Sequence, residues 1–265
     1  MRRVHSPLMR RSAPLALALA ASLGVGAAGA ARAQDRGVQR VVSLGGACVG
    51  CDLSTRKLEG ARFIGSDFRG ALLVGSDLKG AVFLGARFNG ANLAHANLHD
   101  AVMTGAAFNS ADFSGADLSG VSGVGVDMAN AKLDMANLSD AEAAGADLRN
   151  AQARGARFDH ARLGAAQLKD GDFVGASFRG ADLTGTILTN ARLEGADFSG
   201  ARMRGTQLFG ADLSAARGLT REQLNAACFD HNTRLPPDLT PVERGCGRAG
   251  GFVSHRDPDH DHDRD

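Results

Sequence analysis

The sequence contains neither tryptophan nor tyrosine, and charge of neither sign is in excess across its 265 residues. Thirty Lys and Arg stand against 29 Asp and Glu, but the first 33 residues hold five Arg and no acid, so the remainder is slightly acidic. Proteins that bind nucleic acid in bulk carry a large positive excess, so this class of function loses its support. The hydrophobic fraction of 44% is ordinary for a folded domain and excludes wholesale disorder.

Signatures of catalysis are missing as well. Despite 35 Gly, there is no phosphate-binding loop followed by Lys-Ser or Lys-Thr, no Gly-x-Ser-x-Gly elbow and no His-Glu-x-x-His pair. We therefore expect no enzyme activity, no cofactor and no small-molecule substrate. Beyond the N-terminal region, no stretch is apolar enough to cross a bilayer.

The N-terminus has the organisation of a secretory signal peptide. Several Arg precede an almost unbroken apolar run over 13–30, and Ala31-Arg32-Ala33 supplies the small-x-small pattern that signal peptidase cleaves. A membrane anchor is the alternative, but the Ala- and Gly-rich run is short and weakly hydrophobic. The sequence thus predicts a signal peptide over 1–33 and a protein that is periplasmic or secreted.

A five-residue period runs without a slip from Leu53 to Leu213. Of its 33 bulky positions, 17 are Leu, ten are Phe and three are Met, and only Gly123, Ala143 and Ala153 depart. Two positions earlier the residue is small, and from 61 to 211 it is Ala 24 times in 31. Two positions later, from 50 to 210, Gly occurs 21 times.

This period fits neither an α-helix nor a flat strand. Residues five apart on a helix would wind around every face, and on a strand an odd spacing would alternate between faces. The pattern requires a chain that turns a corner every five residues and always presents the same position inward, which is a solenoid. Gly suits corners with positive φ, and the expected substitutes are Asn130, Asn150, Asn190, Asp100 and Asp140.

Runs such as Ala91-Asn92-Leu93, Ala111-Asp112-Phe113 and Ala181-Asp182-Leu183 resemble the A-(D/N)-(L/F)-x-x signature of pentapeptide-repeat proteins. The resemblance covers roughly 165 residues without insertion. It implies an all-β fold, a right-handed quadrilateral parallel β-helix with four repeats per coil, about eight coils and a length of ~40 Å.

Four repeats per coil place residues twenty apart above one another. We therefore expect two inward columns of stacked rings, made by Phe68, Phe88 and Phe108 and by Phe158, Phe178 and Phe198. Gly123 and Ala143 share another column and Ala153 faces Ala143, so a narrowed or more mobile segment is predicted around 121–155.

The exposed ends of a solenoid need caps. We assign 34–50 to an N-terminal cap with a starting strand near 38–44, 51–215 to the β-helix, 216–247 to a C-terminal cap and 248–265 to a disordered tail. In the C-terminal cap, Thr220 and Gln223 form a capping box that predicts a short helix to about Cys228.

An oxidising compartment allows the four cysteines to pair. Cys48 and Cys51 both fall on inward positions of the first coil, which favours buried thiols or a local disulfide over a redox pair or half of a metal site. Cys228 and Cys246 flank the cap and are candidates for a second disulfide.

Three polar features of the sequence could suggest metal binding or acid–base chemistry, but a structural or surface role explains them more simply. His95, His99 and Asp100 look like a ligand cluster, but corner and outward positions predict a solvated surface. Asp precedes the bulky residue 11 times, which we interpret as hydrogen bonding to the turn rather than acid–base chemistry. His255, His260 and His262 lie among five Asp in the tail and are weak candidates for loose divalent-metal binding.

An apolar stripe is the most informative surface signal. On one side of the rod the outward positions are apolar over successive coils, where other outward positions are mostly charged or polar, and they are Ile64, Val82, Leu84, Val102 and Val124. A contiguous exposed apolar strip is typical of a partner surface. Partial burial of strand-favouring residues is the alternative interpretation.

The sequence therefore favours a non-catalytic exported module for protein interaction or scaffolding, with self-association and a different protein partner both open. Family resemblance supplies one alternative, a rod that imitates DNA and interacts with a topoisomerase. Export, near-neutral charge and Arg at outward positions weigh against it, the latter being Arg62, Arg87, Arg157, Arg162, Arg192 and Arg202.

Overall fold

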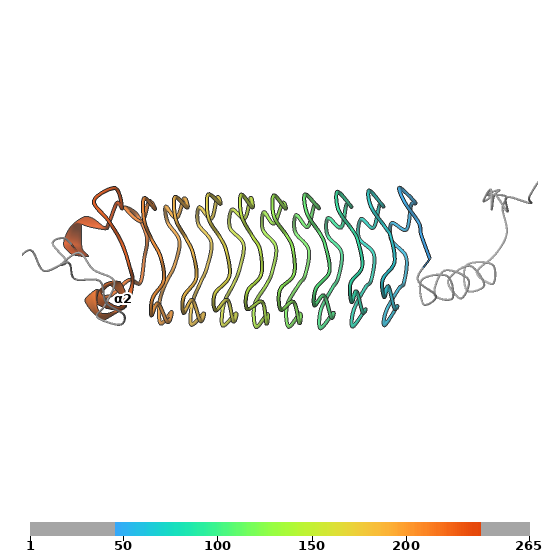
Figure 1. Ribbon diagram of the computed structural model, residues 1–265, viewed down its shortest axis with the longest axis horizontal. Helices are drawn as coiled ribbons and strands as arrows, with labels where there is room; N and C mark the ends of the chain where they lie inside the picture. The colour runs from blue at the N-terminus through green and yellow to red at the C-terminus, as the bar shows by residue number, and fades with distance from the viewer. Residues whose placement is uncertain (1–45, 240–265) are drawn as a thin grey trace, which may run out of the picture.

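The computed structural model describes residues 46–239, and they form one straight rod of stacked coils (Figure 1). From residue 46 to residue 215, every five residues contain one β-bridge followed by a two-residue turn. This pattern begins one repeat before the predicted start of the β-helix at residue 51. Helix α2 (Arg221–Ala226) and the 3₁₀ helix η1 (Pro237–Leu239) follow at the C-terminal end.

The coils pair in parallel with a register of twenty residues. Val82, for example, bridges Arg62 on one side and Val102 on the other. Its N–H donates to the carbonyl of Ala61 at 2.8 Å, and the N–H of Phe63 donates to its carbonyl at 2.7 Å. We call the four sides of the rod faces A, B, C and D. In one coil, face A contains residues 61–65, face B 66–70, face C 71–75 and face D 76–80, and each face recurs every twenty residues along the chain.

The bulky side chains fill the centre of the rod, as the five-residue period predicts. Phe68, Phe88 and Phe108 are buried and stack with ring centroids 5.1 and 5.2 Å apart. The second predicted column is confirmed too, with centroids 5.0 and 5.3 Å apart, and consists of Phe158, Phe178 and Phe198. A further stack, unpredicted, joins Phe63 and Phe83 at 4.9 Å.

Polar side chains at the small position form hydrogen bonds with the backbone. The Ser66 and Ser76 hydroxyls donate to carbonyls three residues earlier, at 2.7 Å each. Thr186 and Thr206 donate to carbonyls of the preceding coil at 2.7 and 2.8 Å. All four side chains are buried, so these bonds remove the cost of an unpaired hydroxyl in the core.

The core around Gly123 is filled from the small position. Val121 and Val126 replace the usual Ala and are buried, and a Cβ on Gly123 would lie 3.3 Å from Cγ1 of Val126. The reverse exchange occurs at Gly171, where a Cβ would lie 2.4 Å from the Phe173 ring. The coil-to-coil hydrogen bonds continue through Gly123 at 2.8 Å, and the narrowed or mobile segment over 121–155 stays a prediction.

The corners adopt positive φ, as the substitution pattern predicts. The five residues named from the sequence have φ between 56° and 60°, and they are Asp100, Asn130, Asp140, Asn150 and Asn190. Side chains at such corners lean over the corner of the next coil. A Cβ on Gly115 would meet the His95 ring at 2.6 Å, so Gly at that corner makes room for the histidine.

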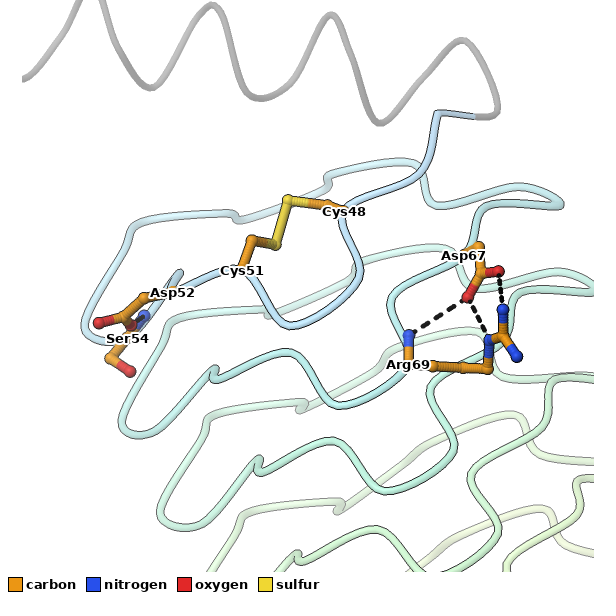
Figure 2. Close-up of a disulfide and its surroundings, with 6 residues drawn as sticks. All are labelled: Cys48, Cys51, Asp52, Ser54, Asp67 and Arg69. Carbon is orange, nitrogen blue, oxygen red and sulfur yellow. Dashed lines mark hydrogen bonds and ion pairs between the residues drawn. A yellow bond between two sulfur atoms is a disulfide. The ribbon is translucent and has the colours of Figure 1, made fainter. Parts of the chain in front are cut away.

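The Asp residues before the bulky position fasten the turns, which confirms their structural interpretation. All 11 accept a hydrogen bond from the backbone N–H two residues later, and they are Asp52, Asp67, Asp77, Asp112, Asp117, Asp127, Asp147, Asp172, Asp182, Asp197 and Asp212. Figure 2 shows the bond that Asp67 accepts from Arg69.

The C-terminal cap continues the ladder of the rod. Thr220 and Gln223 form the predicted capping box, and α2 ends at Ala226, two residues earlier than expected. The Gln223 side-chain amide donates to the carbonyls of Phe198 and Ala201 at 2.8 and 2.9 Å, which ties the helix to the last coil. Beyond α2, Cys228 forms a parallel bridge with Gln207.

Cys48 and Cys51 form a disulfide at the start of the rod (Figure 2). Both are partly buried and pack against the first core side chains, as their inward positions predict. Cys228 is disulfide-bonded as well. Cys246, the predicted signal peptide, the starting strand over 38–44 and the tail with His255, His260 and His262 lie outside the described residues.

Candidate functional site

The five residues of the predicted stripe lie together on face A. Val82 and Val102 bridge each other on adjacent coils. Ile64 and Leu84 also lie on adjacent coils, where the carbonyl of Leu84 accepts from Gly65 at 2.9 Å. We call the five residues the apolar strip, and they are Ile64, Val82, Leu84, Val102 and Val124.

Exposure within the apolar strip divides it into two columns. Ile64, Leu84 and Val124 are 38–46% exposed, whereas Val82 and Val102 are half-buried. Thr104 stands between Leu84 and Val124 in the outer column and turns its hydroxyl to the Ser122 carbonyl at 3.4 Å. The strip is therefore both partly buried, as the alternative interpretation holds, and open to a partner.

Charged residues border the apolar strip at both ends. Arg62 precedes it, is exposed and makes no ion pair with any residue between 46 and 239. Glu142 follows it and pairs with Arg162 of the next coil at 3.0 Å. From Glu142 onward five of the eight outward positions of face A are charged, and the other four besides Glu142 are Arg162, Asp182, Arg202 and Arg204.

Three exposed apolar residues were missed from the sequence. Leu72 is 42% exposed on face C, on the opposite side of the rod from the apolar strip. Met135, at a corner, is 72% exposed, and Val49 is 60% exposed near the start of the rod. Their outward phase could have revealed them, but they are scattered over different coils and sides.

The outward Arg residues lie beside carboxylates. Five of the six singled out from the sequence pair with an acidic residue at 3.0–4.0 Å, and these pairs are Arg87–Asp67, Arg157–Asp159, Arg162–Glu142, Arg192–Asp172 and Arg202–Asp182. Such pairs neutralise carboxylates that a surface imitating DNA would leave free.

Among the carboxylates of residues 46–239, Asp197 has the largest shift in pKa. Its side chain is 10% exposed and accepts from the Ser199 hydroxyl at 2.6 Å, from the Ser199 N–H at 2.9 Å and from Arg179 at 2.7 Å. These bonds, with that of the Ser199 hydroxyl first, lower the pKa of Asp197 to about 2 although burial opposes them.

The model of the pentapeptide repeat family matches eight copies over the rod, at residues 48–83, 83–120, 124–159, 161–198 and 176–214. These matches cover more than half of the chain. The chain belongs to the pentapeptide-repeat family. Proteins of this family fold as right-handed quadrilateral β-helices, which agrees with the four-sided coils described above.

Solved pentapeptide-repeat structures resemble this chain. HetL, which is involved in heterocyst differentiation regulation in the cyanobacterium Nostoc sp. strain PCC 7120, is 26% identical, with 72% of this chain and 78% of HetL covered and a TM-score of 0.37. Full-length QnrB1, a plasmid-mediated fluoroquinolone resistance protein, is 19% identical, with 73% and 95% covered and a TM-score of 0.36. No curated protein matches the chain.

The pentapeptide-repeat coil brings Ser119, His99 and Asp100 together, which sequence reasoning did not foresee. Nδ1 of His99 lies 3.0 Å from the Ser119 hydroxyl, and Nε2 lies 3.1 Å from the Asp100 carboxylate. The hydroxyl already donates to Asp117 at 2.6 Å, and the N–H groups of Ser119 and Gly120 are bonded. The serine therefore has neither a base to activate it nor free amides for an oxyanion.

Within residues 46–239 no group of three His, Cys, Asp or Glu side chains is arranged to hold a metal ion. The candidates in the tail, His255, His260 and His262, lie outside the described residues. No helix of the described part is long and apolar enough to span a membrane.

Proposed function

We propose that this pentapeptide-repeat protein is an exported, non-catalytic rod that binds another protein through the apolar strip of face A. The observation that carries the proposal is the contrast along that face. From Ile64 to Val124 five of the seven outward positions of face A are apolar, whereas from Glu142 to Arg204 five of the eight are charged and only Ala144 is apolar, although the backbone is the same throughout. The coil does not require apolar residues there, so their clustering calls for another cause.

The rod presents these side chains on a rigid surface. The backbone of face A is hydrogen-bonded from coil to coil: Val82 makes bonds of 2.7 and 2.8 Å to the preceding coil, and the Val102 N–H donates to the Ala81 carbonyl at 2.8 Å. A partner therefore meets side chains whose positions are already fixed, which lowers the entropic cost of binding. Family proteins are generally structural or interaction modules, which is consistent with this role.

Export rests on the predicted signal peptide over 1–33, and it places the partner in the periplasm or outside the cell. A disulfide between Cys48 and Cys51 is compatible with an oxidising compartment. Fractionation of cells that express the tagged chain, with mass spectrometry of its N-terminus, tests export. Recovery of the uncleaved chain in the cytoplasm would contradict it.

A crosslinked pull-down tests the binding surface. The tagged wild type is compared with Leu84→Arg/Val102→Arg, which we expect to fold because the same columns hold Arg62, Arg162 and Arg204 in other coils. Leu72→Arg/Val74→Arg on face C is the matched control, since it adds the same charge to the opposite side. Thermal melting checks that all three proteins are folded.

The proposal predicts a partner, or a second copy of the chain, that is lost from the face A variant and kept by the face C control. If all three proteins capture the same partners, the apolar strip is not a binding surface and its residues only favour the strand conformation. Capture of gyrase by the wild type would overturn the export argument and favour the DNA-imitating alternative.

A further inference from the structure

We propose that the apolar strip pairs with the same strip of a second copy, with the two rods antiparallel and related by a two-fold axis at Val102. This inference rests on the proposed function, in that face A is the binding surface, and it names the occupant. It is carried by the order of the side chains along the two outward columns, including the charges at their ends.

The two-fold axis lies between the two copies of face A and is parallel to their strands. It makes the two rods antiparallel and places each outward column opposite the same column of the partner copy. Centred on the coil of Val102, it places Val102 against Val102 and Thr104 against Thr104 of the partner copy. One coil away Leu84 faces Val124, and two coils away Ile64 faces Ala144. In every pair between the two outer columns, both side chains are therefore apolar or small, apart from the threonine pair at the centre.

The charges at the ends of the strip agree with the same register. Two coils from the axis, Arg62 of one copy lies opposite Glu142 of the other, and the symmetry makes this pair twice. Arg62 makes no ion pair within the described chain. Glu142 uses only Oε1 in its bond to Arg162, and within residues 46–239 no hydrogen bond to Oε2 is found. The free cation of one copy thus meets the available carboxylate oxygen of the other.

In a parallel arrangement of the two rods the charges do not match. A two-fold axis along the rod keeps each coil at its own level and exchanges the two columns. It would oppose Arg202 to Arg204 and cover Arg62 with Ile64, which creates like-charge contacts and an unpaired buried cation. The charges therefore select the antiparallel register.

The expected dimer is weak. The matching region spans five coils, about 24 Å along the rod and about 10 Å across, from the usual strand spacing and residue rise. Each copy then contributes roughly 250 Å² of face, well below the ~800 Å² of a standard interface. We expect a dissociation constant on the order of 0.1 mM, so association requires concentrated protein or a second tether.

Single-cysteine variants test the register. Stacked sheets lie ~10 Å apart and coils ~4.8 Å apart, so a short bismaleimide reaches between two copies of Val102→Cys on the axis. Ser122→Cys alone crosslinks poorly because its two copies lie on opposite sides of the axis. Mixed with Val82→Cys, it crosslinks well because these positions face each other. The cysteines of the described rod are disulfide-bonded and do not compete.

Sedimentation equilibrium tests the end charges. Arg62→Glu should weaken the dimer about fivefold, since two exposed pairs are lost at once. The double variant Arg62→Glu/Glu142→Arg should recover most of this loss, and thermal melting verifies that it folds. Arg204→Glu, which lies beyond the matching region, is the control and should leave association unchanged.

The outcomes separate this inference from the proposed function. A wild type that stays monomeric to about ten times the expected dissociation constant, or equal crosslinking of all cysteine variants, would overturn the antiparallel dimer. If Leu84→Arg/Val102→Arg still lost a different protein in the pull-down, face A would remain a binding surface with another occupant. Efficient crosslinking of Val102→Cys with the expected mixed pair would support the dimer.

Discussion

The two halves of face A have the same backbone and opposite surfaces. From Ile64 to Val124 the outward positions are mostly apolar, and from Glu142 onward they carry ion pairs such as Arg162–Glu142 at 3.0 Å. Inside the rod the two halves are alike, because rings stack at 5.1 Å between Phe68 and Phe88 and at 5.0 Å between Phe158 and Phe178. Inward positions thus determine the fold, and outward positions are free to specify what the rod binds.

The largest effect should come from emptying the core. Phe88→Ala removes a buried ring that contacts Phe63, Phe68, Phe83 and Phe108, and we expect a loss of about 3–4 kcal/mol in the free energy of unfolding. Chemical denaturation measures it. The outward variant Leu84→Ala serves as the control and should lose less than about 1 kcal/mol. Equal losses would contradict the division between inward and outward positions.

A smaller loss should follow from restoring the usual residue at a departure. Gly171→Ala introduces the alanine found at most small positions, yet its Cβ would lie 2.4 Å from the Phe173 ring and 3.2 Å from the Leu168 carbonyl. We expect a destabilisation of about 2 kcal/mol, since the ring is buried and must shift. Gly164→Ala, whose Cβ would have ordinary contacts, is the control. A melting temperature unchanged by Gly171→Ala would contradict this account.

The middle of the rod provides a comparison within the core. The bulky positions of 121–155 include Gly123, Ala143 and Ala153, whereas the flanking coils carry rings. We expect amides of this segment to exchange about tenfold faster than those of the coils on either side, since a solenoid opens locally where neighbouring coils are least stabilised. Hydrogen exchange measured by mass spectrometry tests this. Uniform protection along the rod would show that Val121 and Val126 compensate fully.

Acid should reveal the contribution of the turn carboxylates. The pKa of Asp197 is about 2 in the fold and near 3.9 in the unfolded chain, so its stabilisation is complete above pH 4 and is lost as the pH falls towards 2. We expect Asp197→Asn to cost about 1 kcal/mol at pH 7, after allowance for solvent screening, and almost nothing at pH 2.

Denaturation curves across this pH range check the acid prediction. Asp182→Asn is the matched control, because the Asp182 carboxylate is more exposed, hydrogen bonds from Thr184 lower its pKa, and its ion pair with Arg202 is long at 4.0 Å. It should show a smaller dependence on pH. A constant difference between wild type and Asp197→Asn from pH 7 to pH 2 would rule out the ionised carboxylate as the source.

The smallest effect on stability should come from the variant that matters most for binding. Leu84→Arg/Val102→Arg should change the free energy of unfolding by less than about 0.5 kcal/mol, because Arg stands in the same columns at Arg62 and Arg204. Chemical denaturation tests this alongside the pull-down. A large loss of stability would mean that the strip residues serve the rod itself.

Much of this molecule could be read from the sequence because one short-range rule repeats. The inward phase, the ring columns, the positive φ corners and the turn-fastening Asp residues each follow from positions within five residues or from the register of twenty. The capping box of Thr220 and Gln223 is equally local, and the structure confirms it. The sequence did not predict that a larger residue at a small position fills the space left at a bulky position. Whether Val126 fits beside Gly123 depends on the direction of the valine side chain.

The sequence by itself determined the coil, its core and the location of the apolar strip, since all three depend only on which residues share a phase. The tertiary structure decided what touches what between coils. It showed that the Ser119 hydroxyl donates its hydrogen bond to Asp117 rather than to His99, that five outward Arg neutralise carboxylates, and that Arg62 remains without an ion pair among the described residues. Such contacts depend on side-chain rotamers and on distances of a few ångströms across the stacked coils, which no repeat pattern encodes.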